Sequence, residues 1–78
     1  MQACRGTVAS VFAREKYAVA YPLKGGDVPP ELTDKSITFN LEDWRGEVEP
    51  QKGQVIDLDG LWRHARGWRA RSATPAAS

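Results

Sequence analysis

The sequence has a single cysteine, a single histidine and no long apolar run. Cys4 has no second cysteine to pair with, which excludes an intramolecular disulfide and a cysteine-rich metal site. His64 has no second histidine to share a zinc ion with, so we expect no metal and no cofactor. No apolar stretch approaches the roughly 18 residues of a membrane span, and the first residues lack the pattern of a signal peptide. These absences favour a cytoplasmic protein without membrane contact.

The composition is that of an ordinary small globular domain. Of the 78 residues, 41% are hydrophobic and 27% are charged, which argues against disorder. The net charge of +1 implies no partner by itself, but the charges are unevenly placed. Residues 27–49 carry two basic and seven acidic side chains, whereas residues 60–78 carry four arginines and no acid. A fold that brings the two basic ends of the chain together would present a bipolar surface.

Alternating apolar residues between turn signals predict five short strands. The expected strands cover residues 6–12, 17–21, 37–41, 54–58 and 68–72. The first two form a hairpin over the charged segment 13–16, and Asp59-Gly60 is expected to be a turn. Pro50 limits the segment 42–46 to a single helical turn. The pattern predicts an all-β fold, a small five-stranded antiparallel barrel, because closure removes exposed sheet edges.

One domain accounts for all of these strands. It is expected to cover residues 5–72 with a loop at 22–36, between an N-terminal tail at 1–4 and a flexible C-terminal tail at 73–78. A helical alternative exists for residues 58–73, where apolar residues recur every three or four positions. Gly60 and Gly67 argue against that helix, since each glycine costs about 1 kcal/mol in a helix interior.

Five segments, in this order, carry a resemblance to a known family. They are Arg5-Gly6-Thr7-Val8, Glu15-Lys16-Tyr17-Ala18-Val19, Ser36-Ile37-Thr38-Phe39-Asn40-Leu41, Lys52-Gly53-Gln54-Val55-Ile56-Asp57-Leu58 and Arg66-Gly67-Trp68-Arg69-Ala70. Together they resemble the cold-shock domain, a five-stranded OB-fold barrel whose members open with Lys-Gly-Thr-Val and carry Gly-Gln-Val-Val on the fourth strand. The similarity spans roughly residues 5–75, with an insertion-like loop after the second strand.

The resemblance implies binding of single-stranded nucleic acid. That family stacks bases on aromatic side chains of its first three strands, and each stacked base contributes about 1–3 kcal/mol. The corresponding positions in this sequence are Ser10, Val11, Tyr17, Val19, Thr38, Asn40 and Leu41. Only Tyr17 is aromatic, so most of the family's stacking face is missing. The resemblance therefore supports the barrel more strongly than the activity.

The segment from Leu61 to Arg71 interleaves four arginines with two tryptophans. Guanidinium groups pair with phosphates and indoles stack on bases, so this composition is typical of a nucleic-acid site. The candidate contacts are Lys16, Tyr17, Trp62, Arg63, Arg66, Trp68, Arg69 and Arg71. Arginine and tryptophan also dominate protein interfaces. A structural interpretation is open as well, in which Trp68 fills the end of the barrel and the arginines pair with Glu47 or Glu49.

Two functional hypotheses follow from these residues. The first is a non-catalytic module that binds single-stranded RNA or DNA. The second is a protein-interaction module, either an inhibitor or assembly factor or a homodimer, on a barrel that has lost the stacking face. An enzyme is not expected, because no nucleophile, base and orienting group can be assembled from the sequence. The acidic residues near Trp44 are expected to form a solvated face; they are Glu42, Asp43, Glu47 and Glu49.

Overall fold

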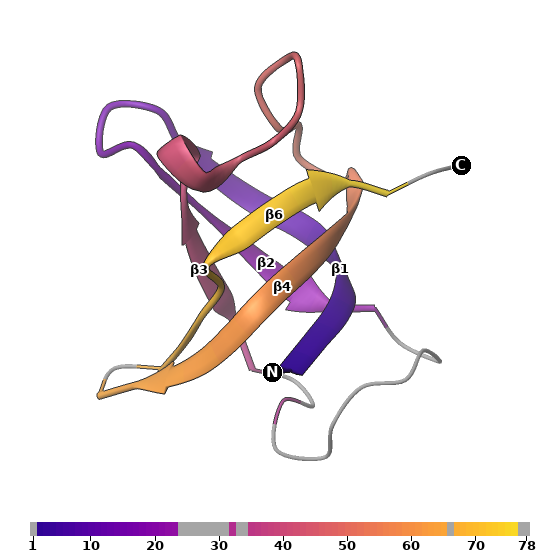
Figure 1. Cartoon of the computed structure of the whole chain (residues 1–78). Coiled ribbons are helices and arrows are strands. Elements are labelled where there is room, and N and C mark those ends of the chain that lie inside the picture. The colour runs from indigo at the N-terminus through magenta and orange to yellow at the C-terminus, as the bar shows by residue number, and fades with distance from the viewer. Residues whose placement is uncertain (1, 24–31, 33–34, 66, 77–78) are drawn as a thin grey trace.

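The structure is a computed structural model that describes residues 2–23, 32, 35–65 and 67–76. Its strands are β1 (Gln2–Phe12), β2 (Tyr17–Pro22), β3 (Ile37–Asn40), β4 (Val55–His64), β5 (Gly67–Arg69) and β6 (Ser72–Pro75), and the 3-10 helix η2 (Leu41–Asp43) follows β3. Figure 1 shows the strands curling around one another into a single barrel. No helix in the described ranges is long and apolar enough to cross a membrane.

The barrel closes through five neighbouring strands. The order is β1-β2-β3-β5-β4, and β4 pairs in turn with β1. The predicted small five-stranded, OB-like barrel is therefore confirmed. The pairs are antiparallel apart from β3–β5, which is parallel through Ile37 opposite Trp68 and Thr38 opposite Arg69. A ring with an odd number of strands cannot reverse direction at every step, so closure of five strands requires a parallel pair.

More of each chain end pairs with the barrel than predicted, since the expected tails were residues 1–4 and 73–78. Strand β1 already pairs with β4 from Gln2 onwards, and Cys4 is buried. Strand β6 continues β5 along the same side of β4, and Ala73 is fully buried within it. The helical alternative for residues 58–73 is excluded, because this stretch holds most of β4, all of β5 and the start of β6. The expected loop at 22–36 lies mostly outside the described residues.

Two bulges change which side chains face the interior. In β1 the register against β2 shifts between Val8 and Ser10, so that Ala9 is an extra residue. A second shift lies in β4 opposite Gln2 and Ala3, and Gly60 is the extra residue there. The prediction that Asp59-Gly60 forms a turn is thus wrong. The chain continues through Gly60 as a kinked strand, with φ at +63° and its amide donating to Asp59 Oδ1 at 2.8 Å.

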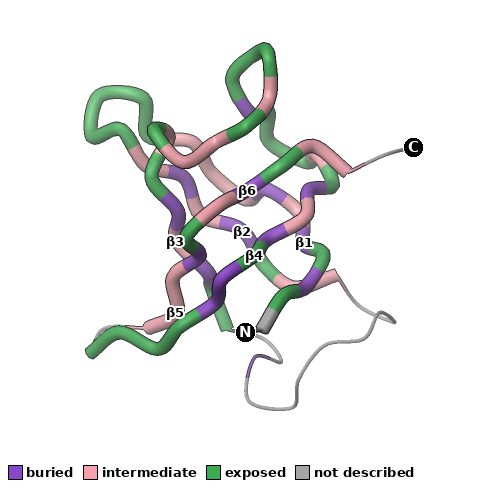
Figure 2. The backbone as a smooth tube through the Cα atoms, viewed as in Figure 1, coloured by how far each residue is buried: buried purple, intermediate pink, exposed green. Residues whose placement is uncertain are grey.

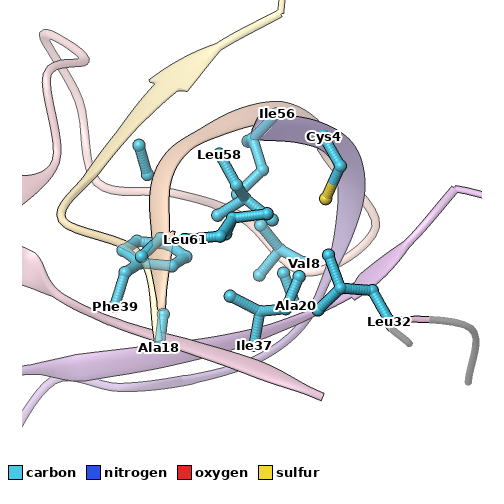
Figure 3. Close-up of a cluster of buried hydrophobic side chains, with 12 residues drawn as sticks. Cys4, Val8, Ala18, Ala20, Leu32, Ile37, Phe39, Ile56, Leu58 and Leu61 are labelled. Atoms are coloured by element: carbon cyan, nitrogen blue, oxygen red, sulfur yellow. The ribbon is translucent and has the colours of Figure 1, made fainter. Parts of the chain in front are cut away.

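The core consists of side chains from β1, β2, β3, β4 and β6, together with Leu32 before β3 and Ala70 after β5. Its members are Cys4, Val8, Ala18, Ala20, Leu32, Ile37, Phe39, Ile56, Leu58, Leu61, Ala70 and Ala73. Figure 3 shows most of these side chains converging inside the barrel, and Figure 2 shows buried residues alternating with intermediate or exposed ones along the strands. Trp44 covers one side, with its ring stacked on Phe39 at 6.0 Å and its indole N–H donating to the Val48 carbonyl at 2.6 Å.

Candidate nucleic-acid interface

Outward-facing side chains from five strands form a continuous surface. Because Ala18 and Ala20 of β2 face the core, Tyr17 and Val19 face outwards. Their cross-strand partners on β3 are Asn40 and Thr38. Thr38 lies beside Arg69 of β5, and Arg69 lies opposite Trp62 of β4. The register therefore places Tyr17 and the Arg/Trp-rich segment in succession along the outer surface of the barrel, although they are far apart in the sequence.

The β1–β2 hairpin contributes an aromatic pair at one end of this surface. Phe12 and Tyr17 are cross-strand partners, and their rings stack with centroids 4.8 Å apart and planes 26° from parallel. Phe12 is 38% exposed, so its ring remains accessible to solvent. Lys16, in the turn before Tyr17, is exposed and has a positive φ of 64°. The pair thus offers an aromatic surface beside a cation.

Arginines from β5 and the segment after it link the pair to Trp62. The Arg69 guanidinium donates to Asn40 Oδ1 at 3.1 Å, which holds it across the β3–β5 seam. The Arg71 guanidinium lies over the Trp62 ring, 5.8 Å from its centroid, in a cation–π contact. Trp62 is 37% exposed and meets the His64 ring edge-on at 5.3 Å. We call the set Phe12, Tyr17, Asn40, Trp62, Arg69 and Arg71 the aromatic–arginine band.

The remaining candidates lie elsewhere. Trp68 is partly buried against the core and alternates with Arg69, so its indole lies at the end of the barrel instead of on the band. Arg63 lies opposite Trp68 at the tip of the β4–β5 hairpin and is exposed. Arg66 lies outside the described residues. The predicted residues therefore divide into a group on the outer face and a group at the barrel end.

The expected pairing of the arginines with Glu47 or Glu49 is not found. Between described residues, no ion pair joins Arg63, Arg69 or Arg71 to either glutamate; the ion pair there is Arg5–Asp57, at 3.0 Å across β1 and β4. Both side chains of that pair are about half exposed, so it adds little stability. The part of the interpretation that places Trp68 against the barrel end agrees with the structure. Trp68 thus has a packing role, while Arg69 and Arg71 engage Asn40 and Trp62.

The acidic segment after β3 lies next to a tryptophan that packs on the core. Glu42 and Asp43 lie in η2, and the neighbouring Trp44 serves the core. No group of three or more His, Cys, Asp or Glu side chains that could hold a metal ion occurs in the described part of the chain.

Phe12 and Asn40 belong to the band but are absent from the sequence-based candidates. Strict alternation places Phe12 on the same side as Val8, and only the bulge at Ala9 turns it outwards. Asn40 is polar and short, and its role follows from the Arg69 contact, which depends on the parallel β3–β5 pairing. Tyr21, on the same side of β2, is 46% exposed and lies beyond the band, opposite Thr7.

Comparisons with known proteins offer no direct assignment for this surface. No family model, no curated protein and no solved structure matches the chain. Any function therefore has to be inferred from the chain's own side chains and their geometry.

Proposed function

We propose that this protein is a non-catalytic module that binds single-stranded RNA or DNA across the aromatic–arginine band. The observation that carries the proposal is the register that lines up Phe12 and Tyr17, then Arg69, then Trp62 along the outer surface of the barrel. Neighbouring strands lie about 4.8 Å apart, so the path along the sheet from β2 through β3 and β5 to β4 is about 14 Å long. A path of that length suits a few consecutive nucleotides, within the range of sites on OB barrels.

Each part of the band has a chemical role in this proposal. The exposed rings of Phe12 and Trp62 and the partly exposed ring of Tyr17 stack on bases, which is sequence-tolerant because every base has a π-face. Arg69 and Arg71 pair with phosphates, and their contacts to Asn40 and Trp62 reduce the conformational freedom lost on binding. Ser10, Thr38 and Leu41 are not aromatic and cannot stack on bases. Residues of the band on β4 and β5 take over part of that role in this proposal. It is this replacement that supports nucleic-acid binding on a cold-shock-like barrel.

The proposal is tested by titrating the protein with a fluorescently labelled single strand of about ten nucleotides at low salt, with anisotropy and tryptophan quenching as readouts. Tyr17→Ala and Trp62→Ala are each expected to weaken binding by about 1–3 kcal/mol, or roughly 5- to 150-fold. Tyr21→Ala is the matched aromatic control and should leave affinity almost unchanged, because Tyr21 is exposed but outside the band.

Salt dependence separates the arginines from the aromatic rings. Each phosphate contact on a single strand contributes about 0.7 to the slope of log affinity against log salt. Arg69→Gln should therefore lower the slope by about that amount, whereas Tyr17→Ala should lower the affinity and keep the slope. Arg45→Gln is the charge-matched control, since Arg45 is exposed on the segment after η2.

Absence of any quenching or anisotropy change for the unmodified protein at low salt would exclude nucleic-acid binding. A protein partner would then be the better hypothesis for the same surface, because exposed tryptophan and arginine are also typical of protein interfaces. Recovery of one stoichiometric protein after nuclease treatment, lost in Trp62→Ala, is the result expected for that alternative.

A further inference from the structure

A pocket opens at the end of the barrel where the β4–β5 hairpin meets the start of β3. It has a volume of about 400 Å³, and its lining includes Lys35, Ser36, Arg63, His64, Gly67 and Trp68. Figure 2 shows the hairpin that carries β5 projecting from this end of the molecule. The volume lies in the range of small-molecule sites, so the pocket has room for one nucleotide.

The lining chemistry is suited to a phosphate next to a flat ring. Lys35 and Arg63 come from separate segments and supply two cations, and no carboxylate is among the described residues that line the pocket. Ser36 adds a hydroxyl, and the Trp68 indole supplies an aromatic wall held in place by its packing on the core. Guanidinium and ammonium groups favour an anionic ligand.

The pocket is continuous with the aromatic–arginine band. A smaller hollow of about 60 Å³ adjoins it and shares Ser36, His64, Gly67 and Trp68 with it. That hollow also includes Thr38 and Arg69 in its lining, and Arg69 is part of the band. The His64 ring, which lines the pocket, contacts Trp62 of the band. A strand on the band therefore reaches the pocket past Arg69 without crossing the barrel.

We propose that this pocket receives the phosphorylated end of the bound strand. The terminal phosphate pairs with Lys35 and Arg63, and the terminal base lies against Trp68. The inference rests on the proposed function, since the band must hold the rest of the strand. A terminal phosphate monoester carries about −1.5 to −2 charges at neutral pH, more than the single charge of an internal phosphodiester, so two cations at the end of the path discriminate between them.

The test compares oligonucleotides of identical sequence with a 5′-phosphate, a 3′-phosphate or hydroxyls at both ends. One phosphorylated form is expected to bind about tenfold more tightly than the hydroxyl form, as two charge-assisted hydrogen bonds allow. In Arg63→Gln and Lys35→Gln this preference should fall towards one, while affinity for the hydroxyl form stays nearly constant. Arg45→Gln, a matched charge removal away from the pocket, should keep the preference.

A nuclear magnetic resonance titration locates the contact independently. Addition of the preferred oligonucleotide should shift the Trp68 indole and Gly67 amide signals, and the hydroxyl form should shift them less. Equal affinities for all three oligonucleotides would overturn the pocket inference and leave the proposed function intact. If inorganic phosphate or a mononucleotide shifts these signals but no oligonucleotide perturbs Tyr17 or Trp62, the pocket is a site for free phosphates, and both proposals are wrong.

Discussion

Gly60→Ala is expected to destabilise the barrel through two separable effects. Gly60 has a φ of +63°, a conformation that costs an L-residue about 1–2 kcal/mol. A Cβ at this position would also lie 2.9 Å from Arg71 Cβ, closer than two carbon atoms pack. Overpacking of this kind costs a further 1–3 kcal/mol. The combined loss is about 2–5 kcal/mol, a large part of the roughly 4–12 kcal/mol expected for a domain of this size.

Gly53 provides a matched control for the first of these effects. Its φ is also positive, at +88°, but a Cβ there would meet nothing within 4 Å. Gly53→Ala should therefore cost only the backbone strain, about 1–2 kcal/mol. The difference between the two alanine variants isolates the overlap with Arg71.

Urea unfolding followed by tryptophan fluorescence measures both variants, with a slope near 1 kcal/mol/M for a chain this short. The double variant Gly60→Ala/Arg71→Gly removes the Cβ that is overlapped, so it should recover the overlap part of the loss when compared with Arg71→Gly alone. Equal losses for Gly60→Ala and Gly53→Ala, or no coupling between positions 60 and 71, would refute the bulge geometry in β4.

Three further substitutions test local features of the fold. Lys16→Gly should raise the free energy of unfolding by about 0.5 kcal/mol in urea, because relief of a φ of 64° exceeds the added entropy of the unfolded chain. Trp44→Phe should lower it by about 1 kcal/mol through loss of the hydrogen bond to the Val48 carbonyl, and calorimetry should show a lower Tm. Burial raises the pKa of the Cys4 thiol, so the folded state retains the proton that the unfolded state releases. Stability should therefore fall as pH rises above the ordinary thiol pKa, and Cys4→Ala should remove that part of the decline.

The sequence predicts the strands well where alternation is regular. Ile37 and Phe39 are buried and Thr38 lies on the outer side, as the pattern in β3 indicates. The same rule fails in β1, where one inserted residue reverses the sides and brings Phe12 to the surface. The prediction of a turn at Gly60 is wrong because a glycine with positive φ is equally suitable for a turn and for a bulge. Neither bulge can be recognised from the local sequence, since both depend on how the strand pairs with its partner.

The candidate site was only partly predictable for a related reason. Residue types identify Tyr17, Trp62, Arg69 and Arg71, but nothing in the local sequence places Tyr17 near the others. Their proximity depends on β5 lying beside β3, a pairing between residues about thirty positions apart. The separation of Trp68 from the band likewise follows from its inward direction on β5.

The parallel β3–β5 seam is short, joined through Ile37 and Trp68 and through Thr38 and Arg69. Opening the barrel at this pairing breaks the fewest hydrogen bonds. Its amides should therefore exchange with solvent sooner than the amides of the long β1–β4 pairing. A ligand that contacts both Tyr17 and Trp62 would bridge the β3–β5 pairing. Ligand binding would then slow hydrogen exchange most at the amides of Thr38 and Ala70, which couples binding to closure of the barrel.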